Sequence, residues 1–485
     1  MSYKPSIKRN LVFKLLYQIL AMVIPLVTAP YVSRVLGADG VGIYSYTQSY
    51  AMYFIYFALL GTGTYGTREI ARCRDDRKEY SKTFWEIELL TVVTSGVCLF
   101  FWCFLILFYR DYRIYFIALT PSILAQTFDI EWFYTGHERI SYTVLWNAVC
   151  KVAGLVCIFL FVREKSDLLL YIFLNSFILM LGNISMWIYL PGMLERVNFR
   201  ELSIRRHFKE TLVYFVPTVA TSIYTILDKM LIGIITSDSF ENGYYEQATK
   251  IINIVKPLCF TALNSMMTAR MSYLCSVDNQ EEIKKRIELS IDTIMFMAVG
   301  SMFGIIAVSE TFVPLFFGPG YEPVVNLLRV MSVILVIIGI SNCLGSHYYV
   351  PVGKIKLSTY FLIMGSVVNL CLNLLLIPYI GAMGAAIGSI GAESAITILY
   401  VHFDGGYLKW KDIFFRIYKK IIAGIVMLIV VWFVDDIVKL SSLLELVLQV
   451  VTGAGVYFAV LLVLRDASAL YFLNVLLAKL KLRGV

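Results

Sequence analysis

The chain has 485 residues, of which 59% are hydrophobic and only 16% are charged. Soluble domains carry roughly a quarter charged residues, so water is not the main solvent of this protein. The short connections between its apolar stretches leave no room for a folded soluble domain, and the net charge of +8 lies mostly in those connections. The composition therefore predicts an all-α polytopic membrane protein.

Apolar stretches of about 20 residues, the length that crosses a hydrocarbon core of about 30 Å as a helix, recur from end to end. About 14 transmembrane helices are predicted, at residues 11–36, 41–66, 84–108, 113–136, 140–162, 168–190, 211–236, 244–269, 287–316, 323–348, 357–379, 382–403, 417–437 and 443–464. The N-terminus has the basic start of a secretion signal. Its apolar run continues without a small-residue cleavage site, so we expect it to remain as the first helix.

The most hydrophilic connection, residues 194–210, divides the predicted helices into six, six and two. We expect an N-terminal six-helix lobe at 1–193, a basic cytoplasmic linker at 194–210 and a C-terminal six-helix lobe at 211–408. Two additional helices and a cytoplasmic tail follow at 409–485. After Asp466 the tail has the composition of an interfacial amphipathic helix.

A short internal repeat supports two related lobes. "GADGVGIYSYTQSY" opens the second span and "FENGYYEQATKI" opens the eighth, and both contain Gly-x-Tyr, starting at Gly42 and Gly243. The preceding spans each contain an internal proline, Pro25 and Pro217. Both spans start on the same side, so the pattern indicates parallel repeats related by an axis along the membrane normal.

Lysine and arginine concentrate in the segments that lie inside if the N-terminus is cytoplasmic, so both termini are predicted to be cytoplasmic. The positive charge is explained by this topology and by anionic lipids, without a nucleic-acid partner. The nine cysteines show no metal-ligand spacing and are interpreted as small buried apolar residues.

Charged residues inside the spans are the candidate functional residues. In "TILDKMLIG", Asp228 and Lys229 stand where an ionised group costs roughly 2.5 to 3.5 kcal/mol. Neighbouring residues on a helix point about 100° apart, so these two cannot pair face to face. We expect Asp228 to pair with Lys250, at similar depth on the next span, and Lys229 to face the interior.

The deep charges are more often cationic than anionic, which favours an anionic substrate such as a pyrophosphate. The predicted substrate-binding residues are Arg34, Lys151, Lys229, Lys250, Lys256 and Arg329, and the predicted structural or coupling residues are Asp228, Glu246 and Glu393. No acid at matched depth is evident for Lys256 or Arg329. The alternative is a set of ion pairs that hold the bundle together without touching substrate. Tyr44, Tyr46, Tyr50, Tyr53 and Tyr56 stack on sugar rings, contact lipid or pack within the protein.

Several local motifs resemble one known family. "IPLVTAPYVSRVLGADGVGIYSYTQS", "GTGTYGTREIAR", "DKMLIG" with "NGYYEQATKI", and "GAMGAAIGSIGAES" are similar to segments of Wzx-type polysaccharide flippases, up to about residue 405. These belong to the multidrug/oligosaccharidyl-lipid/polysaccharide exporter superfamily. The positions that match the family are Arg34, Asp129, Glu131, Lys151, Asp228, Lys229, Lys250 and Glu393.

The resemblance implies two six-helix lobes around a central cavity that opens alternately to either side. It implies a flippase that moves undecaprenyl-pyrophosphate-linked oligosaccharide from the inner to the outer leaflet of the bacterial cytoplasmic membrane. The product would enter capsule, exopolysaccharide or O-antigen synthesis. Expected partners are this lipid-linked substrate, membrane lipids, and the polymerase and glycosyltransferases of the same pathway. No cofactor or metal is expected; coupling to sodium or protons is left open.

The sequence leaves three alternatives. A lipid II flippase or a multidrug exporter would share the fold, although a drug exporter favours acids over cations in its cavity. A membrane polysaccharide polymerase would need a large outer loop with catalytic charges, whereas the longest predicted outer loop is "SDSFENG". No Walker motif is present. The chain is therefore predicted not to be an enzyme.

Overall fold

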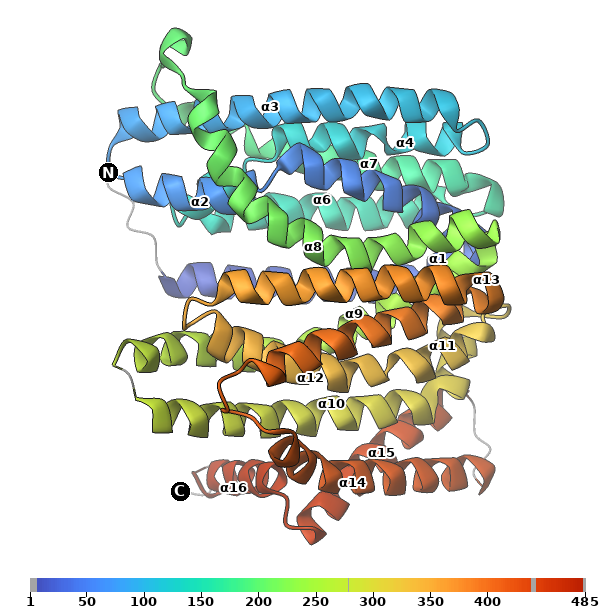
Figure 1. Ribbon diagram of the computed structural model, residues 1–485. Coiled ribbons are helices and arrows are strands. Elements are labelled where there is room, and N and C mark those ends of the chain that lie inside the picture. The colour runs from blue at the N-terminus through green and yellow to red at the C-terminus, as the bar shows by residue number, and fades with distance from the viewer. Residues whose placement is uncertain (1–6, 278, 438–441, 483–485) are drawn as a thin grey trace. The chain divides into compact units, whose positions relative to one another are not determined.

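The computed structural model describes residues 7–277, 279–437 and 442–482, and within these ranges the regular structure is entirely helical (Figure 1). The main helices are α1 (Ile7–Leu59), α2 (Thr62–Cys73), α3 (Arg77–Phe108), α4 (Arg113–Leu124), α5 (Glu131–Gly136), α6 (Ile140–Phe161), α7 (Leu168–Met186), α8 (Ile204–Thr236), α9 (Ser239–Ser276), α10 (Gln280–Phe317), α11 (Pro323–Met331), α12 (Val333–Leu344), α13 (Ile355–His402), α14 (Trp410–Ile437), α15 (Ser442–Val463) and α16 (Ala467–Leu482). Short turns η1 (Ala125–Phe128), η2 (Lys165–Asp167), η3 (Leu190–Gly192), η4 (Phe199–Glu201) and η5 (Gly345–Tyr349) connect them.

The predicted spans fall mainly on these helices, although the one at 113–136 is divided into α4, η1 and α5. The prediction of an all-α polytopic membrane protein is confirmed. Eight of the described helical stretches are long and apolar enough to cross a membrane by length and composition. Some helices begin before the apolar run because a polar residue caps them. The Asp76 carboxylate accepts hydrogen bonds from the backbone N–H groups of Lys78 and Glu79, so α3 begins at Arg77.

Two of the long helices each contain two predicted spans, separated by a glycine with a positive φ. In α1 the chain reverses at Gly37, whose φ of 71° is in the left-handed region that favours glycine (Figure 1). In α13 it reverses at Gly381, with φ of 51° (Figure 1). The first and second spans, and the eleventh and twelfth, are therefore connected without a loop.

The chain forms two compact units. The first comprises residues 1–234 with 238–243, and the second comprises 235–237 with 244–485. By packing, most of α8 therefore belongs with the first unit. The predicted linker at 194–210 separates two six-helix lobes that were inferred from the sequence repeat. The division by packing does not test those lobes, so the linker stays a prediction.

The two glycines of the sequence repeat meet each other in the first unit. A Cβ atom on Gly42 would overlap the carbonyl oxygen of Ser239, and one on Gly243 would overlap that of Ala38. Each clash is with the residue one turn before the other glycine, so the contact is reciprocal. The Ser239 hydroxyl also donates a hydrogen bond to Asp39. The Gly-x-Tyr repeat therefore marks a close backbone crossing that only glycine permits.

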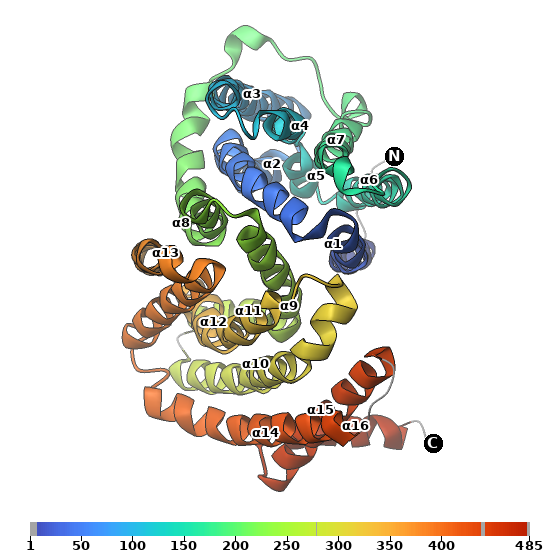
Figure 2. The same ribbon diagram turned by 90° about the vertical axis from the view of Figure 1, so that its right-hand side faces the viewer.

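Tyrosines of α1 fill the core of the first unit. Tyr46 and Tyr50 are buried, their hydroxyl oxygens lie 2.9 Å apart, and the Tyr50 hydroxyl lies 3.2 Å from that of Tyr109 (Figure 2 shows α1 among its neighbours). For these two residues the packing interpretation is confirmed.

In the second unit, a buried ion cluster joins α10, α14 and α16. The fully buried Lys420 ammonium lies 2.7 Å from Asp292 Oδ1 and 2.8 Å from Asp466 Oδ2. The Ser468 hydroxyl donates to Asp292 at 2.7 Å. Asp466 also accepts from the backbone N–H groups of Ser468 and Ala469, and so caps α16. The tail predicted to follow Asp466 is thus helical as far as Leu482; residues 483–485 lie outside the described residues, and its interfacial location stays a prediction.

We predict that Lys420→Met destabilises the protein by about 3 to 5 kcal/mol, because it leaves two buried carboxylates without their cation. The unfolding temperature in detergent measures this. Lys411→Met, at an exposed position of the same helix, is the control and should change that temperature little. Equal effects of the two variants would contradict a stabilising role for the cluster.

Candidate functional site

The two charged residues of "TILDKMLIG" differ in how deeply they are buried. Asp228 is only 1% exposed, whereas Lys229 is half-buried. Tyr53, on α1, lies close enough for its hydroxyl to interact electrostatically with the Asp228 carboxylate. Both Asp228 and Lys229 make further interactions. The pairing of Asp228 with Lys250 joins residues of the two separate units, so it stays a prediction.

Two predicted substrate-binding cations of the second unit have acidic neighbours on the same or an adjacent helix. The Lys250 ammonium lies 3.4 Å from Glu246, one turn earlier on α9. The Arg329 guanidinium of α11 lies 2.8 Å from Glu310 of α10. Both cations remain about a quarter exposed. These pairs are therefore accessible, unlike the Lys420 cluster.

For Arg329 the expectation that no acid lies at matched depth is wrong, because Glu310, near the end of α10, pairs with it. Glu393 of α13 is close enough to interact electrostatically with Lys256. Counting depth along single helices missed these acids because they come from neighbouring helices. Whether these cations bind substrate stays a prediction.

The remaining predicted residues are spread over the two units. Arg34 of α1 is exposed and Lys151 of α6 is half-buried, and both make interactions within the protein. Glu393 is 6% exposed. Among the family-matched positions, Asp129 accepts a hydrogen bond from the backbone N–H of Glu131 at 3.1 Å, which fixes the turn into α5.

A buried hydrogen-bond network that was not predicted joins α2, α3 and α8. His207 Nε2 lies 2.7 Å from Glu86, and its Nδ1 lies 2.7 Å from the Tyr65 hydroxyl. The other Glu86 oxygen accepts from the backbone N–H of Ser203 at 2.8 Å. His207 is fully buried and Glu86 is 1% exposed. In the sequence His207 stands within the basic run "RRHFKE", where nothing distinguishes it from a solvent-exposed residue.

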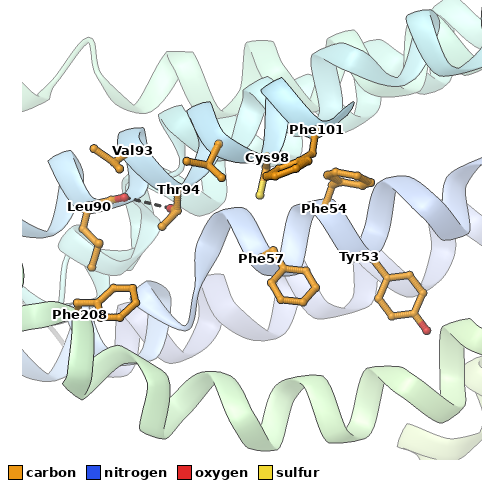
Figure 3. A pocket seen from close by; sticks show the side chains of 10 residues that line it. Tyr53, Phe54, Phe57, Leu90, Val93, Thr94, Cys98, Phe101 and Phe208 are labelled. Carbon is orange, nitrogen blue, oxygen red and sulfur yellow. Dashed lines mark hydrogen bonds between the residues drawn. The ribbon is translucent and has the colours of Figure 1, made fainter. Parts of the chain in front are cut away.

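An apolar groove also lies in the first unit, beside this network. It has a volume of about 680 Å³ and runs between α1, α3 and α8 (Figure 3). Its lining residues are Tyr53, Phe54, Phe57, Leu90, Val93, Thr94, Val97, Cys98, Phe101 and Phe208. The groove was not predicted, because its residues resemble any lipid-facing helix surface in the sequence.

Residues 7–267 match a family described as "Polysaccharide biosynthesis protein". The chain is 25% identical over 407 residues to an Escherichia coli K12 protein named "Putative O-antigen transporter", covering 82% of this chain and 97% of that protein. It is 23% identical over 351 residues to a Haloferax volcanii protein named "Probable low-salt glycan biosynthesis flippase", covering 70% of this chain and 71% of that protein.

Solved structures share the fold. The lipid II flippase MurJ in an inward closed conformation is similar with a TM-score of 0.71 at 15% identity, covering 94% of this chain and 99% of that one. An inward-facing multidrug resistance transporter of the MATE family gives a TM-score of 0.56 at 14% identity, covering 79% of this chain and 97% of that one. At these identities the likeness shows the fold and not the substrate.

We predict that His207→Ala loosens the start of α8, because Glu86 and Tyr65 lose a buried partner at a cost of about 1 to 3 kcal/mol each. Amide hydrogen exchange over residues 203–211 should rise and the unfolding temperature should fall. Lys209→Ala, at an exposed position two residues away, should leave both unchanged. Unaltered exchange in His207→Ala would show that the network does not hold α8.

Proposed function

Because the chain belongs to the polysaccharide biosynthesis protein family, we propose that it is a flippase for lipid-linked oligosaccharide. It moves undecaprenyl-pyrophosphate-linked repeat units from the inner to the outer leaflet of the bacterial cytoplasmic membrane by alternating access. Both termini are cytoplasmic. The product feeds capsule, exopolysaccharide or O-antigen synthesis.

The observation that carries this proposal is the match to a relative named as an O-antigen transporter over 97% of that relative's length. A second relative is named as a glycan biosynthesis flippase. Transporter and flippase names support the prediction that the chain is not an enzyme. The same names argue against the polymerase alternative.

The proposed site residues suit a pyrophosphate chemically. Lys250 and Arg329 are held in ion pairs that are partly exposed, at 3.4 Å and 2.8 Å from their carboxylates. A doubly charged pyrophosphate offers such cations stronger charge-assisted hydrogen bonds than a single carboxylate does. Substrate can therefore compete with Glu246 or Glu310 for these cations, and the displaced carboxylate then needs another cation. Lys229 and Lys256 belong to the same proposed set.

Energy coupling is a further part of the proposal. The displaced or buried carboxylates Asp228, Glu246 and Glu393 are the groups that would bind a proton or sodium ion. A carboxylate freed from its cation by the substrate gains affinity for another cation. This exchange would link substrate binding to the ion.

We predict that purified protein in proteoliposomes flips a fluorescent lipid-pyrophosphate oligosaccharide. Lys250→Ala and Arg329→Ala should each slow flipping by about tenfold or more, which is what a lost interaction of about 1.4 kcal/mol with the transition state gives. Lys411→Ala, at an exposed position, is the control and should flip at the wild-type rate.

The same assay separates the alternatives. If both variants flip at the wild-type rate, the pyrophosphate binds elsewhere, and the proposed function is unaffected. Equal transport of lipid II would favour the lipid II flippase. Transport of a cationic drug with no flipping of lipid-linked oligosaccharide would contradict the proposed function.

A further inference from the structure

The groove between α1, α3 and α8 is open on one long side. Its rim residues Val93, Val97, Phe101, Phe57 and Phe208 are between 46% and 57% exposed. In Figure 3 the side chains of α1 and α3 face each other across it, with α8 beneath. Its volume of about 680 Å³ lies within the range of about 300 to 1,000 Å³ typical of ligand pockets. The groove is large enough for a long hydrocarbon chain.

Its lining differs from an ordinary lipid-facing surface. Half of the lining side chains are aromatic: Tyr53, Phe54, Phe57, Phe101 and Phe208. A hydrocarbon chain gains nothing from the hydrophobic effect on moving from lipid into the groove, so selectivity must come from close packing. Rigid rings fit the flat double bonds and methyl branches of an isoprenoid better than they fit a flexible saturated chain.

One end of the groove is charged. Phe208 lines the groove at the start of α8, and Arg205 and Lys209 are exposed on the same turns of that helix. Residues three apart on a helix share a face, so Arg205 stands next to Phe208. An apolar channel that ends at two exposed cations complements a hydrocarbon chain that ends in a phosphate.

The other end reaches the interior acid. Tyr53 contributes its ring to the groove, and its hydroxyl points away from the groove toward α8 (Figure 3), where it interacts with Asp228. The Tyr53 hydroxyl is buried and makes no hydrogen bond within the described part of the chain. A chain in the groove would press on a residue that interacts electrostatically with Asp228.

We propose that this groove binds the polyprenyl chain of the lipid-linked substrate, with the pyrophosphate beside Arg205 and Lys209. The inference rests on the proposed function and adds a docking site separate from the interior cations. The substrate enters through this groove at the membrane surface before its pyrophosphate moves to the interior. Because Tyr53 lies between the groove and Asp228, a chain in the groove changes the surroundings of the Asp228 carboxylate.

The test uses a photoactivatable polyprenyl monophosphate without sugar, added to the full-length protein in lipid nanodiscs. Labelling should concentrate on peptides of α3 and the start of α8. Val97→Trp fills the groove and should reduce labelling at least fivefold. Val92→Trp makes the same change on the same helix at a position that is 41% exposed and outside the groove, and it should stay within twofold of wild type.

Two further variants keep the test decisive if Val97→Trp does not fold. Phe101→Ala widens the groove at an exposed rim position and should also reduce labelling. The double variant Arg205→Ala/Lys209→Ala should weaken labelling by the monophosphate and leave labelling by an uncharged polyprenol unchanged. Equal labelling of all variants, or equal competition by phosphatidic acid, would overturn the proposal.

Labelling and flipping separate the two proposals. If wild type does not flip lipid-linked oligosaccharide but Val97→Trp removes labelling, the groove stands and the proposed function fails. If wild type flips it and Val97→Trp labels and flips like wild type, the function stands and the groove assignment fails.

Discussion

A charge buried in hydrocarbon needs a partner within the protein, because hydrocarbon offers none. The partners divide the charges into two kinds. Lys420 is fully buried and lies 2.7 Å and 2.8 Å from two carboxylates, which joins three helices. Lys250 and Arg329 are paired but about a quarter exposed. The second kind is open enough for a substrate phosphate to compete with the carboxylate.

Two buried contacts hold helices of the first unit together. The Gly42 and Gly243 crossing brings two backbones together where no side chain fits, and the network of Glu86, His207 and Tyr65 fixes the start of α8. Between these fixed points, α8 carries Phe208 at one end of the groove and Asp228 farther along. If the groove binds the polyprenyl chain as proposed, α8 carries both part of the lipid entry site and the buried acid Asp228.

Much of the fold could be predicted because length and apolarity dictate membrane helices. The Gly-x-Tyr repeat was interpreted as a sign of two related lobes, whereas the close crossing that its glycines make was not predicted. The partners could not be predicted in the same way. Glu310 meets Arg329 only because α10 and α11 pack together, and Lys420 looked like one more cytoplasmic lysine in "KWKDIFFRIYKK". Phe57 and Phe101 are lipid-facing residues in the sequence, and only the packing of α1 against α3 makes them the walls of a groove.

The central claim is that the chain moves lipid-linked oligosaccharide across the membrane, and the leaflet distribution of that lipid in cells tests it most directly. Cells that lack the chain should accumulate the lipid-linked repeat unit in the inner leaflet and lose surface polysaccharide, and wild-type protein should restore both. An unchanged distribution, with surface polysaccharide still present, would contradict the account.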